Sequence, residues 1–130
     1  VKGYGVKSSD WQRTEKPKLV KHIRLLKLLL RRVAREGMKD PRQGLALLRS
    51  FTRRWYPRFF QDYKPYHTGS IKGAMPTYRP FQEALDNFDL ASQVWVDNPN
   101  SPEWGSLVKE GVAYLDGYTQ TWQSHLSEQP

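Results

Sequence analysis

The chain has 130 residues, a net charge of +8 and no cysteine. A chain of this length forms one modest hydrophobic core, so we expect a single domain. The lack of cysteine excludes a disulfide framework and a thiolate zinc site, and no apolar run approaches the roughly 20 residues that a membrane span needs.

The two halves of the chain carry opposite charge. Residues 1–66 contain 18 Lys and Arg against 5 Asp and Glu, whereas residues 67–130 contain 3 against 8. Such asymmetry favours nucleic acid, an anionic membrane surface or an acidic protein as the partner of the first half, and it also allows the two halves to pair with each other.

Residues 1–14 combine glycine and serine with scattered aromatic rings, which predicts an extended arm. Residues 15–56 are predicted to form a basic helical hairpin. In its first helix, residues 16–37, one face carries apolar side chains and the opposite face carries cations. The predicted core positions of this helix are Leu19, Ile23, Leu26, Leu30 and Val33.

The turn of the hairpin lies between Gly37, expected just past the first helix, and Asp40. Asp40 followed by Pro41 is a typical helix start, and so short a gap forces the two helices to run antiparallel. The second helix is predicted to end before Pro57. Its apolar positions are Leu45, Leu47, Leu48, Phe51 and Trp55.

Residues 57–79 are rich in proline and aromatic residues without a clean period, which predicts a long extended connection that becomes ordered on a partner. Residues 80–126 predict an acidic helical pair, in which Ser101 and Pro102 mark the start of the last helix. The expected inward positions are Phe81, Leu85, Phe88, Trp104, Leu107, Val108, Gly111, Leu115, Tyr118 and Trp122. The chain is therefore expected to be all-α, a small helical bundle of a basic pair and an acidic pair.

Three glycines interrupt the last predicted helix. Gly105, Gly111 and Gly117 each weaken it by roughly 1 kcal/mol relative to alanine. Their six-residue spacing does not place them on one helical face, so close packing can explain only some of them.

Catalytic patterns are lacking in the sequence. His22, His67 and His125 are far apart, and none belongs to an HExxH motif. His22 borders the two faces of the first helix, where a solvated or partly packed imidazole is expected. No glycine-rich phosphate loop or GxSxG motif occurs. We therefore expect no enzymatic activity, no metal site and no intrinsic cofactor.

Leu28 falls in the middle of the basic face, among Arg24, Arg31 and Arg35. It is either an apolar contact for a partner, surrounded by charged side chains, or one of the many exposed leucines without a role. Nucleic acid would use the cations against phosphates and the aromatic residues of 56–78 for stacking. A membrane surface would need the leucines that the core already uses.

The segment Leu25-Leu26-Lys27, with Leu29-Leu30-Arg31 and Ala34-Arg35 after it, resembles the opening helix of the LYR-motif family. Leu48 to Arg53 is similar to the Arg- and Phe-containing segment that follows in that family. The tyrosine and arginine of the motif are Leu26 and Lys27 here, and the resemblance covers only residues 19–55.

The resemblance implies a mitochondrial helical bundle that binds acyl carrier protein. Basic side chains meet the acidic helix of the carrier, and the acyl-phosphopantetheine belongs to that partner. Lys27, Arg31 and Arg35 are the residues that carry over, with Arg49, Phe51 and Arg53 as weaker additions.

We therefore expect a non-catalytic accessory subunit of a large mitochondrial assembly, most directly a respiratory-chain complex, located in the matrix or peripheral to the inner membrane on its matrix side. The competing hypothesis is a mitoribosomal or other RNA-binding structural protein. The expected partner-binding residues are Arg24, Lys27, Leu28, Arg31, Arg35, Arg49, Phe51 and Arg53.

Overall fold

The computed structural model describes residues 16–54 and 78–128. These residues form four helices, namely α2 (Lys16–Gly37), α3 (Pro41–Arg54), α6 (Arg79–Asp97) and α7 (Glu103–Glu128), and no strand occurs among them. The all-α prediction is confirmed. The predicted arm, and the predicted connection up to residue 77, lie outside the described residues.

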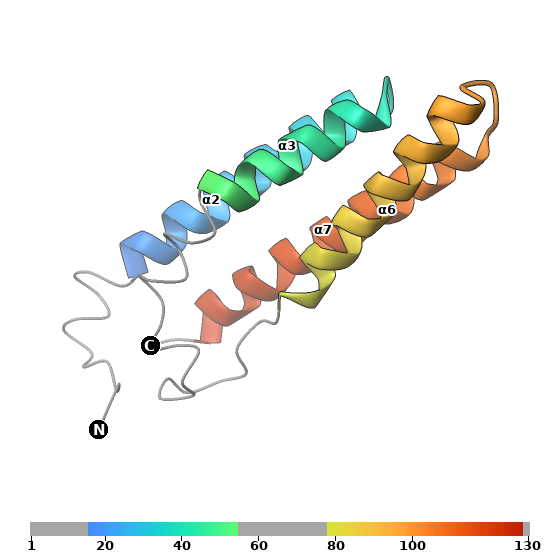
Figure 1. The fold of residues 1–130 in the computed structure, drawn as a ribbon. Helices are drawn as coiled ribbons and strands as arrows, with labels where there is room; N and C mark the ends of the chain where they lie inside the picture. The colour runs from blue at the N-terminus through green and yellow to red at the C-terminus, as the bar shows by residue number, and fades with distance from the viewer. Residues whose placement is uncertain (1–15, 55–77, 129–130) are drawn as a thin grey trace.

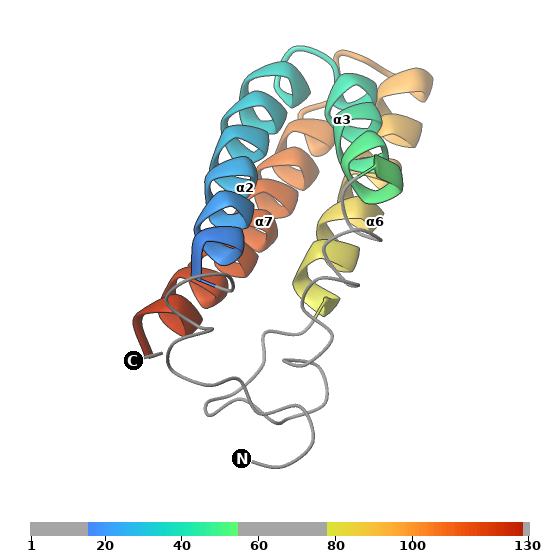
Figure 2. The ribbon, with the colours of Figure 1, turned by 90° about the vertical axis from the view of Figure 1, so that its left-hand side faces the viewer.

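The four helices form an antiparallel bundle in which each helix packs mainly against two neighbours. α2 packs against α3 and α7, and α6 packs against α3 and α7. The basic hairpin of α2 and α3 makes one layer, and α6 with α7 makes the other (Figure 1). Seen from the side, the helix axes run nearly parallel around a common core (Figure 2). Within the described ranges, no helix combines the length and the apolarity needed to cross a bilayer.

Two helix starts are set by local signals, as predicted. The backbone N–H of Arg42 donates to Asp40 Oδ1 at 2.9 Å, and Pro41 is the first residue of α3. The N–H of Glu103 donates to Ser101 Oγ at 3.2 Å at the start of α7. A side chain thus satisfies an otherwise unpaired N–H at each start. The same Arg42 hydrogen-bonds the Asp40 carboxylate, which lowers the pKa of that carboxyl.

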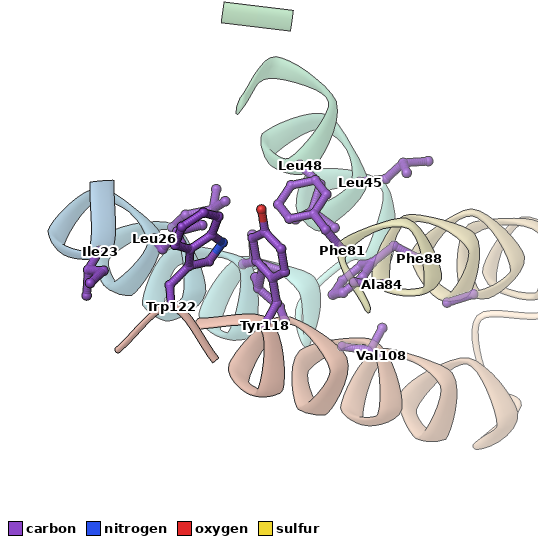
Figure 3. Packing of buried hydrophobic residues seen from close by; sticks show 14 of the residues in the cluster. Ile23, Leu26, Leu45, Leu48, Phe81, Ala84, Phe88, Val108, Tyr118 and Trp122 are labelled. Atoms are coloured by element: carbon purple, nitrogen blue, oxygen red, sulfur yellow. The ribbon is translucent and has the colours of Figure 1, made fainter. Parts of the chain in front are cut away.

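The core is a single cluster to which all four helices contribute. The fully buried large residues are Trp122, Tyr118, Phe81, Phe88, Leu19, Leu26, Leu48, Leu115 and His22. Figure 3 shows Tyr118 and Trp122 projecting from α7 toward Phe81 and Leu26. Six predicted core positions are only partly buried, and they pack against the cluster: Leu30, Leu47, Phe51, Leu85, Trp104 and Leu107.

Phe88 of α6 fits into a niche made by glycines of the other three helices. A Cβ added to Gly37, Gly44 or Gly111 would lie 2.6, 2.4 or 2.9 Å from the nearest Phe88 carbon. Each glycine therefore lets a neighbouring backbone approach the ring closely. Gly105 has no atom within 4 Å of such a Cβ, and neither has Gly117, so packing explains only the middle glycine of α7.

The prediction for Gly37 needs correction. It is the last residue of α2, and it is buried, rather than the residue that follows the helix. No left-handed φ occurs there, so its role is close packing against Phe88. The contact could not be read from α2 alone because Phe88 lies 51 positions later in the chain.

The prediction for His22 is wrong. The residue is fully buried, with the edge of its ring against Trp122 at a centroid distance of 5.4 Å. Burial lowers the pKa of His22 to about 3, so the imidazole is neutral at physiological pH. Its position at the edge of the apolar face was visible in the sequence, but the rings of α7 and α3 that cover it were not.

Candidate partner-binding surface

The two layers of the bundle differ sharply in charge. α2 and α3 together contain 12 Lys and Arg and a single Glu, whereas α6 and α7 contain 2 Lys and Arg and 8 Asp and Glu. One side of the four-helix bundle is therefore positive and the other negative. Only one ion pair joins the layers among the described residues, between Arg49 and Asp89 at 3.6 Å, and both side chains are at least half exposed.

Five of the predicted site residues lie on the outer face of α2. Arg24, Lys27, Leu28, Arg31 and Arg35 are all exposed and recur at steps of one, three or four residues. Leu28 retains 48 % of its surface. Among the described residues, Arg35 is the only cation of this group that forms an ion pair. Its Nε donates to Glu36 Oε2 at 3.0 Å. This hydrogen bond is the main reason why the pKa of Glu36 is lowered.

The predicted residues of α3 do not join that face. Arg49 and Arg53 point toward α6 and line a hollow of about 240 Å³ between the two helices, with Asp86 and Asp89 opposite. Phe51 lies on the other side of α3, half-buried between the core and the outer surface. The predicted set is thus divided between two surfaces, because residues 49 and 53 are about half a turn away from residue 51 around the helix.

Phe51 and Leu28 line an apolar groove of about 430 Å³ between α2 and α3. The groove is walled by two sets with identical spacing. Leu25, Leu28, Leu29 and Arg32 come from α2, and Leu47, Ser50, Phe51 and Arg54 come from α3. Each set occupies positions i, i+3, i+4 and i+7, which is the spacing of one helix face that packs against another element.

Six of these lining residues were not predicted as site residues, namely Leu25, Leu29, Arg32, Leu47, Ser50 and Arg54. A signal for them exists in the sequence, since Leu25, Leu28 and Leu29 form a second apolar seam beside the core seam of α2. The contribution of α3 becomes visible only when its orientation against α2 is known.

Arg32 and Arg54 lie at opposite ends of the groove. Both groups of lining residues end in an arginine, and α2 and α3 run antiparallel. Both side chains are exposed, and neither forms an ion pair with a carboxylate of the described residues. A guanidinium group remains charged at any physiological pH. The groove therefore combines an apolar floor with a fixed positive charge at each end.

Among the described lining residues of the groove, Ser50 is the only hydroxyl nucleophile and no general base occurs. No group of three or more His, Cys, Asp or Glu that could hold a metal ion occurs among residues 16–54 and 78–128. No family model, no curated protein and no solved structure matches the chain. The resemblance to the LYR-motif family stays a prediction.

Proposed function

We propose that this chain is a non-catalytic accessory subunit of a large mitochondrial assembly, in the first place a respiratory-chain complex, and that it binds an acidic protein through the outer face of α2. The observation that supports this function is the group of exposed cations Arg24, Lys27 and Arg31, for which the described residues supply no carboxylate.

A purely structural role would not require this arrangement. Exposed ion pairs contribute only about 0–1 kcal/mol each, and among residues 16–54 and 78–128 the acidic layer offers a single interlayer pair, Arg49 with Asp89. The cations around Leu28 remain available to a partner. An apolar side chain at the centre of a charged rim is the usual composition of a protein interface, where arginine is also enriched.

The proposed partner is an acyl carrier protein, as the LYR resemblance implies. Its acidic helix would meet Lys27, Arg31 and Arg35, and any acyl-phosphopantetheine would arrive with the carrier. RNA is the second candidate, because the same cations could contact phosphates. Leu28 favours protein, since an exposed leucine gains nothing from a phosphate backbone.

The experiment is a titration of the full chain with acyl carrier protein, followed by calorimetry. Replacing Lys27 and Arg31 by glutamate should weaken binding at least about tenfold, which corresponds to 1.4 kcal/mol. The matched control replaces Arg79 and Lys109 of the acidic layer by glutamate, which changes the net charge equally and should leave binding intact.

If the two double variants lost the same amount of binding affinity, net charge alone would explain the effect. This result would refute a specific binding surface on α2. Tight binding of an RNA oligonucleotide, lost in the Lys27 and Arg31 variant and unaffected by excess carrier protein, would replace the proposal by the RNA function.

A further inference from the structure

The groove between α2 and α3 has the shape of a site in which one more helix could pack. Leu25, Leu28 and Leu29 on one wall face Leu47 and Phe51 on the other. Inside the bundle, the same i, i+3, i+4, i+7 spacing is covered by neighbouring helices, as the buried residues Leu19, His22, Ile23 and Leu26 illustrate on α2. The described helices leave the outer seam open at Leu28, which keeps 48 % of its surface exposed, whereas Leu29 at its inner edge is buried.

The charges at the ends of the groove define what can lie in it. Arg32 and Arg54 are separated along the groove by the length of the lining seam, seven residues, or about 10.5 Å at 1.5 Å per residue. Two residues seven positions apart on another helix span the same distance and point to the same side. Acidic side chains at these two positions would each meet an arginine.

We propose that this groove docks one amphipathic helix of an acidic partner protein, with acidic residues at positions i and i+7 and apolar residues at i+3 and i+4 between them. The apolar pair fills the floor beside Leu28 and Leu47, and the acidic residues pair with Arg32 and Arg54. This is recognition of a helix in a groove, and it rests on the proposed function only in that the partner is acidic.

The chain itself does not supply this pattern. Residues 1–15 and 55–77 contain three acidic residues, Asp10, Glu15 and Asp62, and no two of them are seven positions apart. In the described helices, Glu103 and Glu110 have the spacing, but Ser106 and the partly buried Leu107 stand between them instead of two exposed apolar residues. A separate protein is therefore the better occupant.

The test uses the full chain and a fluorescein-labelled synthetic helix of 18 residues with this pattern. A second peptide has the same composition, but its acidic residues are placed at i and i+5. We expect the first peptide to bind at least about tenfold more tightly in fluorescence anisotropy. In ¹³C-methyl NMR spectra, the signals of Leu25, Leu28 and Leu47 should shift, whereas that of Leu90 on α6 should not.

Leu28 and Leu90 provide a matched pair of variants, because the two leucines are 48 % and 50 % exposed. Leu28→Asp should weaken peptide binding at least about tenfold, as for a central contact of an interface, and Leu90→Asp should have no effect. Arg32→Glu and Arg54→Glu should each weaken it, whereas Lys109→Glu should not. Circular dichroism checks that every variant is folded.

Equal affinity for the two peptides, or equal effects of Leu28→Asp and Leu90→Asp, would overturn the proposal. So would a peptide-free dimer in sedimentation that Leu28→Asp dissociates, because the occupant would then be a second copy. The outcome is separable from that of the proposed function: carrier binding that survives Leu28→Asp refutes only the groove, and peptide binding without carrier binding refutes only the choice of partner.

Discussion

The glycine niche around Phe88 gives a sharp test of how the helices pack. A Cβ on Gly44 would lie 2.4 Å from Cε1 and 2.8 Å from Cδ1 of Phe88, and 3.2 Å from the Cα of Gly37. The ring is fully buried between three other helices, so it has no free direction in which to move. Gly44→Ala must therefore push α3 away from both α2 and α6.

The expected size of the effect follows from two opposing contributions. Alanine gains about 1 kcal/mol over glycine in a helix interior, whereas overpacking of a core costs about 1–3 kcal/mol and sometimes more. With backbone as well as side chain in the way, we expect Gly44→Ala to lower the free energy of unfolding by about 1–2 kcal/mol net. This corresponds to a decrease in Tm of roughly 3–8 °C for a chain of this size.

Gly117 is the matched control, because a Cβ there meets no atom within 4 Å. Gly117→Ala should raise the free energy of unfolding by up to about 1 kcal/mol. Both variants are measured by urea unfolding followed by circular dichroism. Phe88→Leu added to Gly44→Ala should recover part of the loss, with a coupling of about 1 kcal/mol in the double-mutant cycle. Stabilisation by both alanines, or an additive cycle, would refute the packing described for Phe88.

Three further measurements test individual side chains by urea unfolding. The pKa of His22 is about 3 in the folded state, against 6.5 in the unfolded state. The unfolded state therefore binds the proton first as the pH decreases, and we expect the free energy of unfolding to fall by about 2 kcal/mol from pH 7 to pH 5. In His22→Gln this contribution to the pH dependence should be lost. Asp40→Ala should cost about 1 kcal/mol through loss of the α3 cap, and Asp40→Asn much less. The coupling between Arg49 and Asp89, both at least half exposed, should not exceed about 0.5 kcal/mol in a double-mutant cycle.

Much of the helix layout could be predicted because its signals are local. Asp40 with Pro41, and Ser101 with Pro102, set helix starts through hydrogen bonds within two residues. The antiparallel hairpin follows from the short gap after Gly37. Apolar periodicity then identified most core residues, since each helix needs one face turned inward.

The errors concern contacts between elements distant in the chain. His22 is buried because Trp122 and Phe51 cover it, and Gly37 is constrained by Phe88. Neither partner can be inferred from the periodicity of α2. Partial burial of Leu30 and Leu85 has a similar origin, since the position of a neighbouring helix decides which edge of an apolar face is closed.

The part of the candidate site that lies on a single helix could be predicted, whereas the part shared by two helices could not. A basic outer face on α2 needs only the helical period, so Arg24, Lys27, Leu28 and Arg31 were placed together. The groove needs two helices in a known register, and Arg54 enters it only because α3 runs antiparallel to α2. Surfaces on one helix are thus readable from sequence, whereas surfaces shared by two helices are not.

The second apolar seam of α2 is a surface on which two copies of the chain could associate, and the surrounding cations oppose this association. An uncovered groove lined by leucines favours self-association. When two copies approach groove to groove, however, each brings Arg32 and Arg54, together with Arg24 and Arg31 beside them, and these like charges repel. The same side chains attract an acidic helix and speed its encounter. The cations around the groove therefore disfavour pairing of two copies, and under the proposed function they favour an acidic partner, which a neutral apolar groove could not do.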